Sequence, residues 1–175
     1  MGALNSIFKS KRLLIIQTIS MLTFFASALA AWKLLSYTLN TTTPVVVILT
    51  GSMLPEYRRG DVLVVDNRFH SLKIADIVVY SIPGRDIPIV HRIHVIHNPG
   101  TEDESRFLTK GDNNQVYDQQ LYARGQSFLS RTNIYGASVA YAPYFGMFTI
   151  WTTDYPWLRY AILGIMGLFI MLGKE

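Results

Sequence analysis

The sequence contains no cysteine, so the chain forms no disulfide bonds. A domain with its own apolar core needs no covalent cross-link, so the lack of cysteine does not exclude an oxidising compartment. Positive charge is only in slight excess, because 16 Lys and Arg are set against 12 Asp and Glu and are scattered along the chain. Without a basic stripe interleaved with aromatic side chains, nucleic acid is not an expected partner.

Internal repeats and low-complexity tracts are missing as well. The 175 residues suffice for one compact domain and a membrane anchor, with no room for a second large domain. The expected domain therefore has to contain both the core and any functional site.

A long apolar stretch is present near the N-terminus, at residues 13–35 (LLIIQTISMLTFFASALAAWKLL). About twenty such residues span a bilayer core as a helix. Basic residues precede the stretch, so the positive-inside rule predicts a cytosolic segment 1–12 and a lumenal remainder. The alternative is a cleaved signal peptide ending near Ala28-Leu29-Ala30. The length of the stretch favours a retained anchor.

Residues 36–157 are expected to form a lumenal β-rich domain. Short runs of β-branched and apolar residues recur there between Gly- and Pro-containing turns, a pattern typical of a small barrel or sandwich. The runs are Pro44–Thr50, Val62–Val65, Ile77–Ile82, Ile87–Ile96, Phe107–Leu108 and Ala137–Tyr141. The segment Asn113–Leu129 is less regular and is expected to be a loop with one helical turn.

The C-terminal segment 158–175 is expected to be a short apolar helix and tail. Its apolar run Tyr160–Leu172 has about thirteen residues, or roughly 20 Å as a helix. A bilayer core of about 30 Å is too thick for such a helix to cross. Its apolarity on all faces favours partial insertion into the membrane, or burial against partner helices, over the alternative of a core helix.

Three polar residues indicate acyl-transfer chemistry. Ser52 follows the strand-like run Val45–Leu49, in the segment Thr50-Gly51-Ser52, and His91 and Asp112 come later in the chain. A serine hydroxyl attacks an amide only when a positioned base takes its proton, and an imidazole oriented by a carboxylate is suited to that role. Each residue alone is a weak signal, because a Gly-Ser pair is usually a turn.

The residues themselves leave several alternatives open. If Ile89–His97 is a strand, His91 and His97 share one face while His94 faces the other way, so two histidines compete as base. The three histidines also raise the possibility of a zinc site, but neither an HExxH motif nor a cysteine cluster accompanies them. Asp118 competes with Asp112 as the acid.

Together these segments resemble the ordered sequence boxes of type I signal peptidases. The matching boxes are Gly51-Ser52-Met53-x-Pro55, Arg59-Gly60-Asp61, His91-Arg92 and Gly111-Asp112-Asn113. Bacterial members have a lysine where His91 stands, so the histidine resembles the endoplasmic-reticulum type. The tail Asp154-Tyr155-Pro156 with its apolar run is similar to that of the catalytic subunit of the eukaryotic signal peptidase complex.

This resemblance implies a site, a substrate and a location. It implies a catalytic set of Ser52, His91 and Asp118, with Asp112 bracing the site and the Thr50 hydroxyl in the oxyanion hole. No cofactor or metal is expected. The implied substrates are signal peptides of translocated preproteins with small residues before the scissile bond, and the implied partners are the lipid bilayer and other membrane subunits of a signal peptidase complex. The protein would be a single-pass type II protein of the endoplasmic reticulum membrane.

Two other functions are compatible with the same sequence. A membrane-tethered β domain could be a non-catalytic scaffold, although the Ser52, His91 and Asp118 set argues against this. The chain could also be a serine protease for other membrane-bound substrates.

Overall fold

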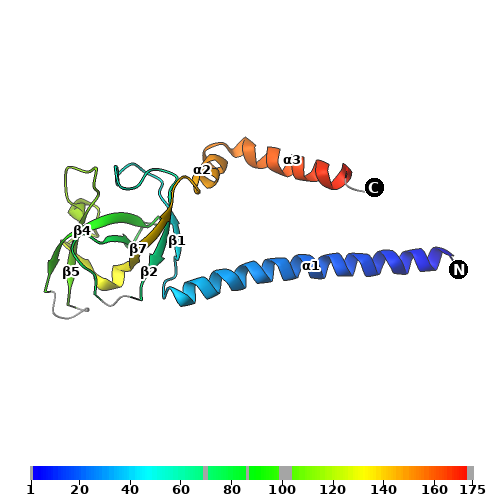
Figure 1. Ribbon diagram of the computed structural model, residues 1–175, viewed down its shortest axis with the longest axis horizontal. Coiled ribbons are helices and arrows are strands. Elements are labelled where there is room, and N and C mark those ends of the chain that lie inside the picture. The colour runs from blue at the N-terminus through cyan, green and yellow to red at the C-terminus, as the bar shows by residue number, and fades with distance from the viewer. Residues whose placement is uncertain (1, 69–70, 86, 99–103, 173–175) are drawn as a thin grey trace. The chain divides into compact units, whose positions relative to one another are not determined.

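The computed structural model describes residues 2–68, 71–85, 87–98 and 104–172. The chain divides into two units, a helical segment that ends at Asn40 and a second unit that begins at Thr41. The second unit contains the sheet and the two C-terminal helices (Figure 1). The prediction of a mainly β domain between an N-terminal apolar helix and a short C-terminal helix is confirmed.

The first unit is a single helix, α1 (Gly2–Thr38). Its segment Lys11–Thr38 is the one described helix that is long and apolar enough to cross a membrane. None of the side chains of its most apolar window is buried by the protein. At 1.5 Å per residue these 28 residues measure about 42 Å, which exceeds a bilayer core of about 30 Å. The expected anchor at 13–35 lies within this helix.

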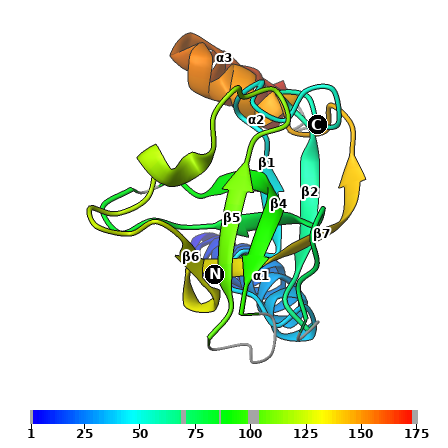
Figure 2. The same ribbon diagram turned by 90° about the vertical axis from the view of Figure 1, so that its left-hand side faces the viewer.

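Seven strands form one antiparallel sheet in the order β1-β2-β7-β3-β4-β5-β6. They are β1 (Val45–Val47), β2 (Val62–Asp66), β3 (Ile77–Tyr80), β4 (Ile89–His97), β5 (Arg106–Lys110), β6 (Leu129–Ser130) and β7 (Ile134–Ala142). Figure 2 shows that the sheet curls strongly. The register shifts within the β2–β7, β3–β7 and β4–β5 pairs, and such irregularities bend strands and increase their twist.

Buried side chains form two clusters within the curl. The larger is made by residues of β3, β4, β5, β6 and β7 and of neighbouring loops, and it includes the fully buried Tyr80 and Ile93. The smaller packs Met53 and Tyr57 against Leu63 and Ile77, and so lies directly behind the loop that bears Ser52. Every residue of β3 is buried, which explains why its sequence Ile-Val-Val-Tyr is a continuous apolar run.

The register shift in β4 changes the face on which its histidines lie. Ile93 pairs with Thr109 but Val95 pairs with Leu108, so His94 is an extra residue in the strand. The expectation that His91 and His97 share one face is therefore wrong, because alternation is reset at the bulge. His91 is buried, whereas His97 is exposed.

Two helices follow β7. They are α2 (Met147–Asp154) and α3 (Pro156–Leu172). The expected tail helix therefore begins at Pro156 and not at Tyr160, since proline is well tolerated in a first helical turn. At 17 residues α3 measures about 25 Å, still shorter than a bilayer core of about 30 Å. The helix α2 was not predicted from the sequence, whereas the one helical turn predicted after Asn113 is present as η1 (Asp118–Gln120).

Candidate active site

The loop that follows β1 holds Ser52 at a fixed backbone position. The N–H of Ile48 donates to the Asp61 carbonyl at 2.9 Å, and the Ile48 carbonyl accepts from the Gly60 N–H at 2.8 Å. Met53, the residue directly after the serine, is 1% exposed, so its side chain anchors the loop in the core. Ser52 itself remains partly accessible, so its hydroxyl is open to a substrate.

The turn after β5 fastens onto this loop. The N–H of Asn113 donates to the Ser52 carbonyl at 2.8 Å, and the Asn113 side-chain amide donates to the Gly51 carbonyl at 3.2 Å. These bonds join two segments sixty residues apart in the chain. The serine is thereby placed relative to β5 and its neighbour β4.

Gly111 makes this close approach possible. A Cβ atom at this position would lie 2.7 Å from the Ser52 carbonyl oxygen and 2.8 Å from both His91 Nε2 and the Asn114 side-chain nitrogen. Such distances are too short for any carbon side chain. The serine, the histidine and the turn therefore meet at one point because residue 111 has no side chain.

His91 contributes an imidazole that is oriented by Asp118. The His91 Nδ1 atom lies 2.5 Å from Asp118 Oδ2, and both side chains are buried. A carboxylate can only accept, so Nδ1 is the donor in this contact, and the other ring nitrogen, Nε2, lies on the side of Gly111 and Ser52. In this structure the hydroxyl of Ser52 bonds to Thr50 and not to His91. Catalytic hydrogen bonds commonly tighten only when substrate binds.

Asp118 is itself held by a buried network of hydroxyl groups. Its Oδ2 atom also accepts from Thr109 Oγ1 at 2.7 Å and from the Tyr80 hydroxyl at 3.0 Å. The Tyr122 hydroxyl accepts from the Thr109 N–H at 3.0 Å and lies 2.9 Å from Thr109 Oγ1. Donors of this kind stabilise the ionised carboxylate that a neighbouring imidazolium requires.

Burial keeps the two tyrosines of this network protonated. Desolvation raises the pKa of Tyr80 far above its ordinary value, and the charge of Asp118 acts in the same direction. Desolvation likewise raises the pKa of Tyr122. Both hydroxyls therefore hold their protons more firmly than an exposed tyrosine does and can act as hydrogen-bond donors.

Asp112 has a different environment from Asp118. Its carboxylate receives two hydrogen bonds from Arg92, from Nε at 2.9 Å and from Nη2 at 2.7 Å. These bonds raise the pKa of the Arg92 guanidinium. Arg92 also donates to the Ala75 carbonyl at 3.0 Å, so the pair ties the turn after β5 to β4 and to the segment before β3. The structure thus brings Asp118, and not Asp112, to His91.

The other two histidines of β4 lie elsewhere. The ring of His94 packs edge-on against Tyr117, and that of His97 packs against Phe128. Within the part of the chain that the structure describes, no three metal-ligating side chains converge. The zinc alternative therefore gains no support from the geometry.

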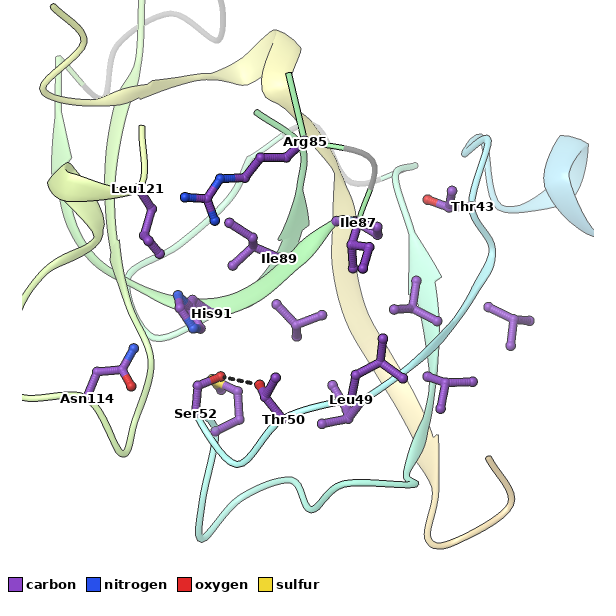
Figure 3. A pocket seen from close by; sticks show the side chains of 17 residues that line it. Thr43, Leu49, Thr50, Ser52, Arg85, Ile87, Ile89, His91, Asn114 and Leu121 are labelled. Carbon is purple, nitrogen blue, oxygen red and sulfur yellow. Dashed lines mark hydrogen bonds between the residues drawn. The ribbon is translucent and has the colours of Figure 1, made fainter. Parts of the chain in front are cut away.

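Ser52 and His91 lie at the end of an apolar cleft of about 1000 Å³ (Figure 3). The Thr50 hydroxyl is 3.2 Å from Ser52 Oγ at this end of the cleft. The cleft is lined by Thr43, Val45, Val46, Val47, Ile48, Leu49, Thr50, Ser52, Met53, Arg85, Ile87, Pro88, Ile89, Val90, His91, Asn114 and Leu121.

Most of the residues that support the site were not predicted from the sequence. Thr109, Tyr80 and Tyr122 act on Asp118 through contacts between strands and loops that no local pattern reveals. Gly111 stood within a recognised box, but its close approach to Ser52 and His91 is visible only in three dimensions.

Comparisons with known proteins agree on one family. A family model described as the signal peptidase C-terminal short helix matches residues 147–172, which include α2 and α3. A signal peptidase complex catalytic subunit SEC11 from Metarhizium acridum is 46% identical over 152 residues, 86% of this chain and 87% of the relative. One from Colletotrichum graminicola is 45% identical over 161 residues, 91% and 92% of the two chains. Subunit SEC11C of Canis lupus familiaris is 42% identical over 167 residues, 95% and 86%.

Replacing Gly111 with alanine is expected to damage the site more than the fold. The new methyl group has to push apart Ser52 and His91, and overpacking of this kind typically costs about 1–3 kcal/mol. We expect cleavage of a precursor substrate to fall at least about tenfold, by analogy with other misplacements of reacting groups. Gly164→Ala, at a glycine with open space around it, is the matched control and should retain activity. Full activity of Gly111→Ala would contradict the close approach.

The Asp118→Asn and Asp112→Asn variants are expected to lose different properties, the first catalytic activity and the second stability. Asp118→Asn removes the charge that stabilises the imidazolium and should lower kcat by about 10²–10⁴-fold. Asp112→Asn breaks the pair with Arg92 and should chiefly lower the Tm. Measuring kcat and the thermal melt of both variants separates the two roles. A fully active Asp118→Asn enzyme beside a well-folded, inactive Asp112→Asn enzyme would reverse the assignment.

Proposed function

The chain belongs to the family of signal peptidase complex catalytic subunits, and from this premise we propose that it is a serine endopeptidase that removes signal peptides from preproteins at the endoplasmic reticulum. The observation that carries the proposed chemistry is the 2.5 Å contact between His91 and Asp118 beside the loop of Ser52. An oriented imidazole next to an accessible serine is suited to acyl transfer.

In the first half of the proposed reaction, Ser52 Oγ attacks the carbonyl carbon of the scissile bond. His91 Nε2 takes the hydroxyl proton, and Asp118 stabilises the resulting imidazolium. When the tetrahedral intermediate collapses, the C–N bond breaks and His91 gives its proton to the leaving nitrogen. The mature protein departs with a new amino terminus, and the signal peptide remains as an ester on Ser52.

In the second half, water replaces the departed amine. His91 Nε2 takes a proton from the water as its oxygen attacks the ester carbonyl. Collapse of the second intermediate breaks the bond to Ser52 Oγ, which receives the proton back from His91. The signal peptide leaves with a free carboxyl group, and the enzyme is restored.

The negative charge on the carbonyl oxygen needs donors in both halves. We propose the N–H of Ser52 and the hydroxyl of Thr50 for this oxyanion hole. Two observations support the choice. No hydrogen bond among the described residues engages the Ser52 N–H, and the Thr50 hydroxyl lies 3.2 Å from Ser52 Oγ.

The cleft can bind an extended peptide between two free strand edges. β1 is an edge strand of the sheet and, among the described residues, pairs only with β2. Residues Ile89–His91 pair with β3 on one side, and the pairing of β4 with β5 begins only at Arg92. Main-chain groups on both borders are thus available for strand addition, while the apolar lining receives side chains of the signal peptide.

The proposed membrane orientation follows from α1. Lys11 and Arg12 stand at the start of the apolar segment, which favours a cytosolic N-terminus. With residues 13–35 as the anchor, the domain 36–157 is lumenal and the protein has a single-pass type II orientation. The apolar side chains of this helix are largely exposed, so lipid and other subunits of the complex are the proposed neighbours.

The C-terminal helices are proposed to sit at the lumenal interface. Aromatic side chains are concentrated and exposed from the end of β7 to the start of α3, at Tyr141, Tyr144, Phe145, Phe148, Trp151, Tyr155, Trp157 and Tyr160. Tyr and Trp are favoured at the boundary between headgroups and lipid tails. A salt bridge of 2.6 Å between Arg59 and Asp154 links α2 to the loop that follows Ser52. The depth at which these helices sit in the membrane can therefore determine the distance of the active site from the membrane surface.

Ser52→Ala is expected to abolish processing while leaving the fold and membrane insertion intact. Loss of a nucleophile typically lowers kcat by about 10³–10⁶-fold. The measurement is cleavage of a translocated precursor by the purified complex, with Ser71→Ala, at an exposed serine, as the control. Normal processing by the Ser52→Ala chain would mean that another group is the nucleophile, or that this subunit is a scaffold.

Lysine substitutions on α3 are expected to impair the processing of membrane-inserted substrates and to leave peptide-bond hydrolysis unchanged. Ile165 and Leu168 are both exposed on α3. Replacing them with lysine places two charges in or near the apolar layer, and processing of a membrane-inserted preprotein should fall about tenfold or more. Hydrolysis of a short soluble peptide should be unchanged, as should both activities of the control Ile165→Leu. Equal loss of both activities would show that α3 instead supports the fold.

A further inference from the structure

Arg85 places a charged side chain in a cleft whose lining is otherwise mostly apolar. Of the 17 lining residues, Arg85 alone is a Lys, Arg, Asp or Glu, and most of the others are aliphatic. Figure 3 shows its guanidinium extending into the part of the cleft where Ile89 and Leu121 lie. A cation in this position bears directly on which peptides the cleft accepts.

A well-defined turn fixes the origin of this side chain. The N–H of Arg85 donates to the carbonyl of Ile82 at 3.0 Å, and Ile82 is 4% exposed. Pro83 and Gly84 occupy the centre of the turn, and Gly84 has a φ of 87°, as the third position of a type II turn requires. The turn is therefore anchored in the core, and the arginine projects from a defined backbone position.

Arg85 also differs from several other arginines of the domain in having no carboxylate partner among the described residues. Arg59, Arg68 and Arg92 are each paired with an aspartate at 2.6–2.7 Å. The backbone N–H is the only group of Arg85 with a hydrogen bond in the described part of the chain. A guanidinium has five N–H donors and no acceptor, so its natural partner is a carboxylate or carbonyl oxygen supplied by a ligand.

We propose that Arg85 determines substrate specificity by charge. It favours precursors with a carboxylate side chain, and disfavours those with a cationic side chain, at the positions that bind beside it. This inference rests on the proposed function, because the ligand is the extended precursor peptide itself. Since Arg85 and His91 line the same cleft, these positions lie within a few residues of the scissile bond.

Charge reversal tests this role. The probe is a set of otherwise identical precursors with Glu, Gln or Lys placed in turn at six positions on each side of the cleavage site, outside the small residues required next to the bond. The full chain in its complex cleaves each, and the readout is the ratio of kcat/KM for Glu over Lys within each enzyme. A general loss of activity cancels in this ratio.

The wild-type enzyme should prefer Glu over Lys by about twofold to fivefold at one or two adjacent positions, the size of an ion pair with an exposed arginine. Arg85→Glu should reverse the preference at those positions, and Arg85→Gln should remove it. Arg124→Glu, which reverses an exposed charge outside the cleft lining, should keep the wild-type ratio.

Two negative outcomes are distinct. Efficient cleavage with the same ratios in the wild-type and Arg85→Glu enzymes would overturn the role of Arg85 and leave the proposed function standing. If no precursor is cleaved, or if cleavage survives Ser52→Ala, the proposed function fails and the role of Arg85 fails with it.

Discussion

The buried hydrogen bond between His91 and Asp118 is the interaction on which the rest of the site depends. His91 stands on β4 and Asp118 on η1, so the bond exists only when the curled sheet and the segment after β5 have both folded. An ionised carboxylate out of water is costly unless it is paired and hydrogen-bonded. Tyr80 on β3 and Thr109 on β5 stabilise the Asp118 carboxylate by donating hydrogen bonds from their hydroxyl groups. Burial keeps the Tyr80 hydroxyl protonated.

The same folding steps build the cleft. The turn that follows β5 carries Gly111, whose missing side chain admits both the serine loop and the imidazole, and Asn113, which fastens that loop. The free edges of β1 and of Ile89–His91 border the cleft beside Ser52. The proposed catalysis and the proposed peptide binding therefore depend on the same sheet topology. The link from Arg59 to Asp154 extends this coupling to the C-terminal helices.

Local patterns predicted the elements well and the contacts between them poorly. Alternating apolar residues and Gly- or Pro-containing turns located the main strands, and an uninterrupted apolar run located α1. The bulge at His94 was not predictable, because the pairing with β5 determines it and local alternation does not. The bulge places His91 and His97 on different faces of β4. The choice between Asp112 and Asp118 could not be derived from spacing either, since Arg92 and His91 each select an aspartate through tertiary contacts.

The most direct test of this account observes the proton between His91 and Asp118. Nuclear magnetic resonance of the complex with isotope-labelled histidine can detect the Nδ1 proton and identify the tautomer of His91. The account predicts a strongly deshielded Nδ1 proton at neutral pH, with Nε2 unprotonated, that disappears in a folded Asp118→Asn chain. A proton on Nε2 with a bare Nδ1, or a signal that survives the loss of the Asp118 charge unchanged, would contradict it.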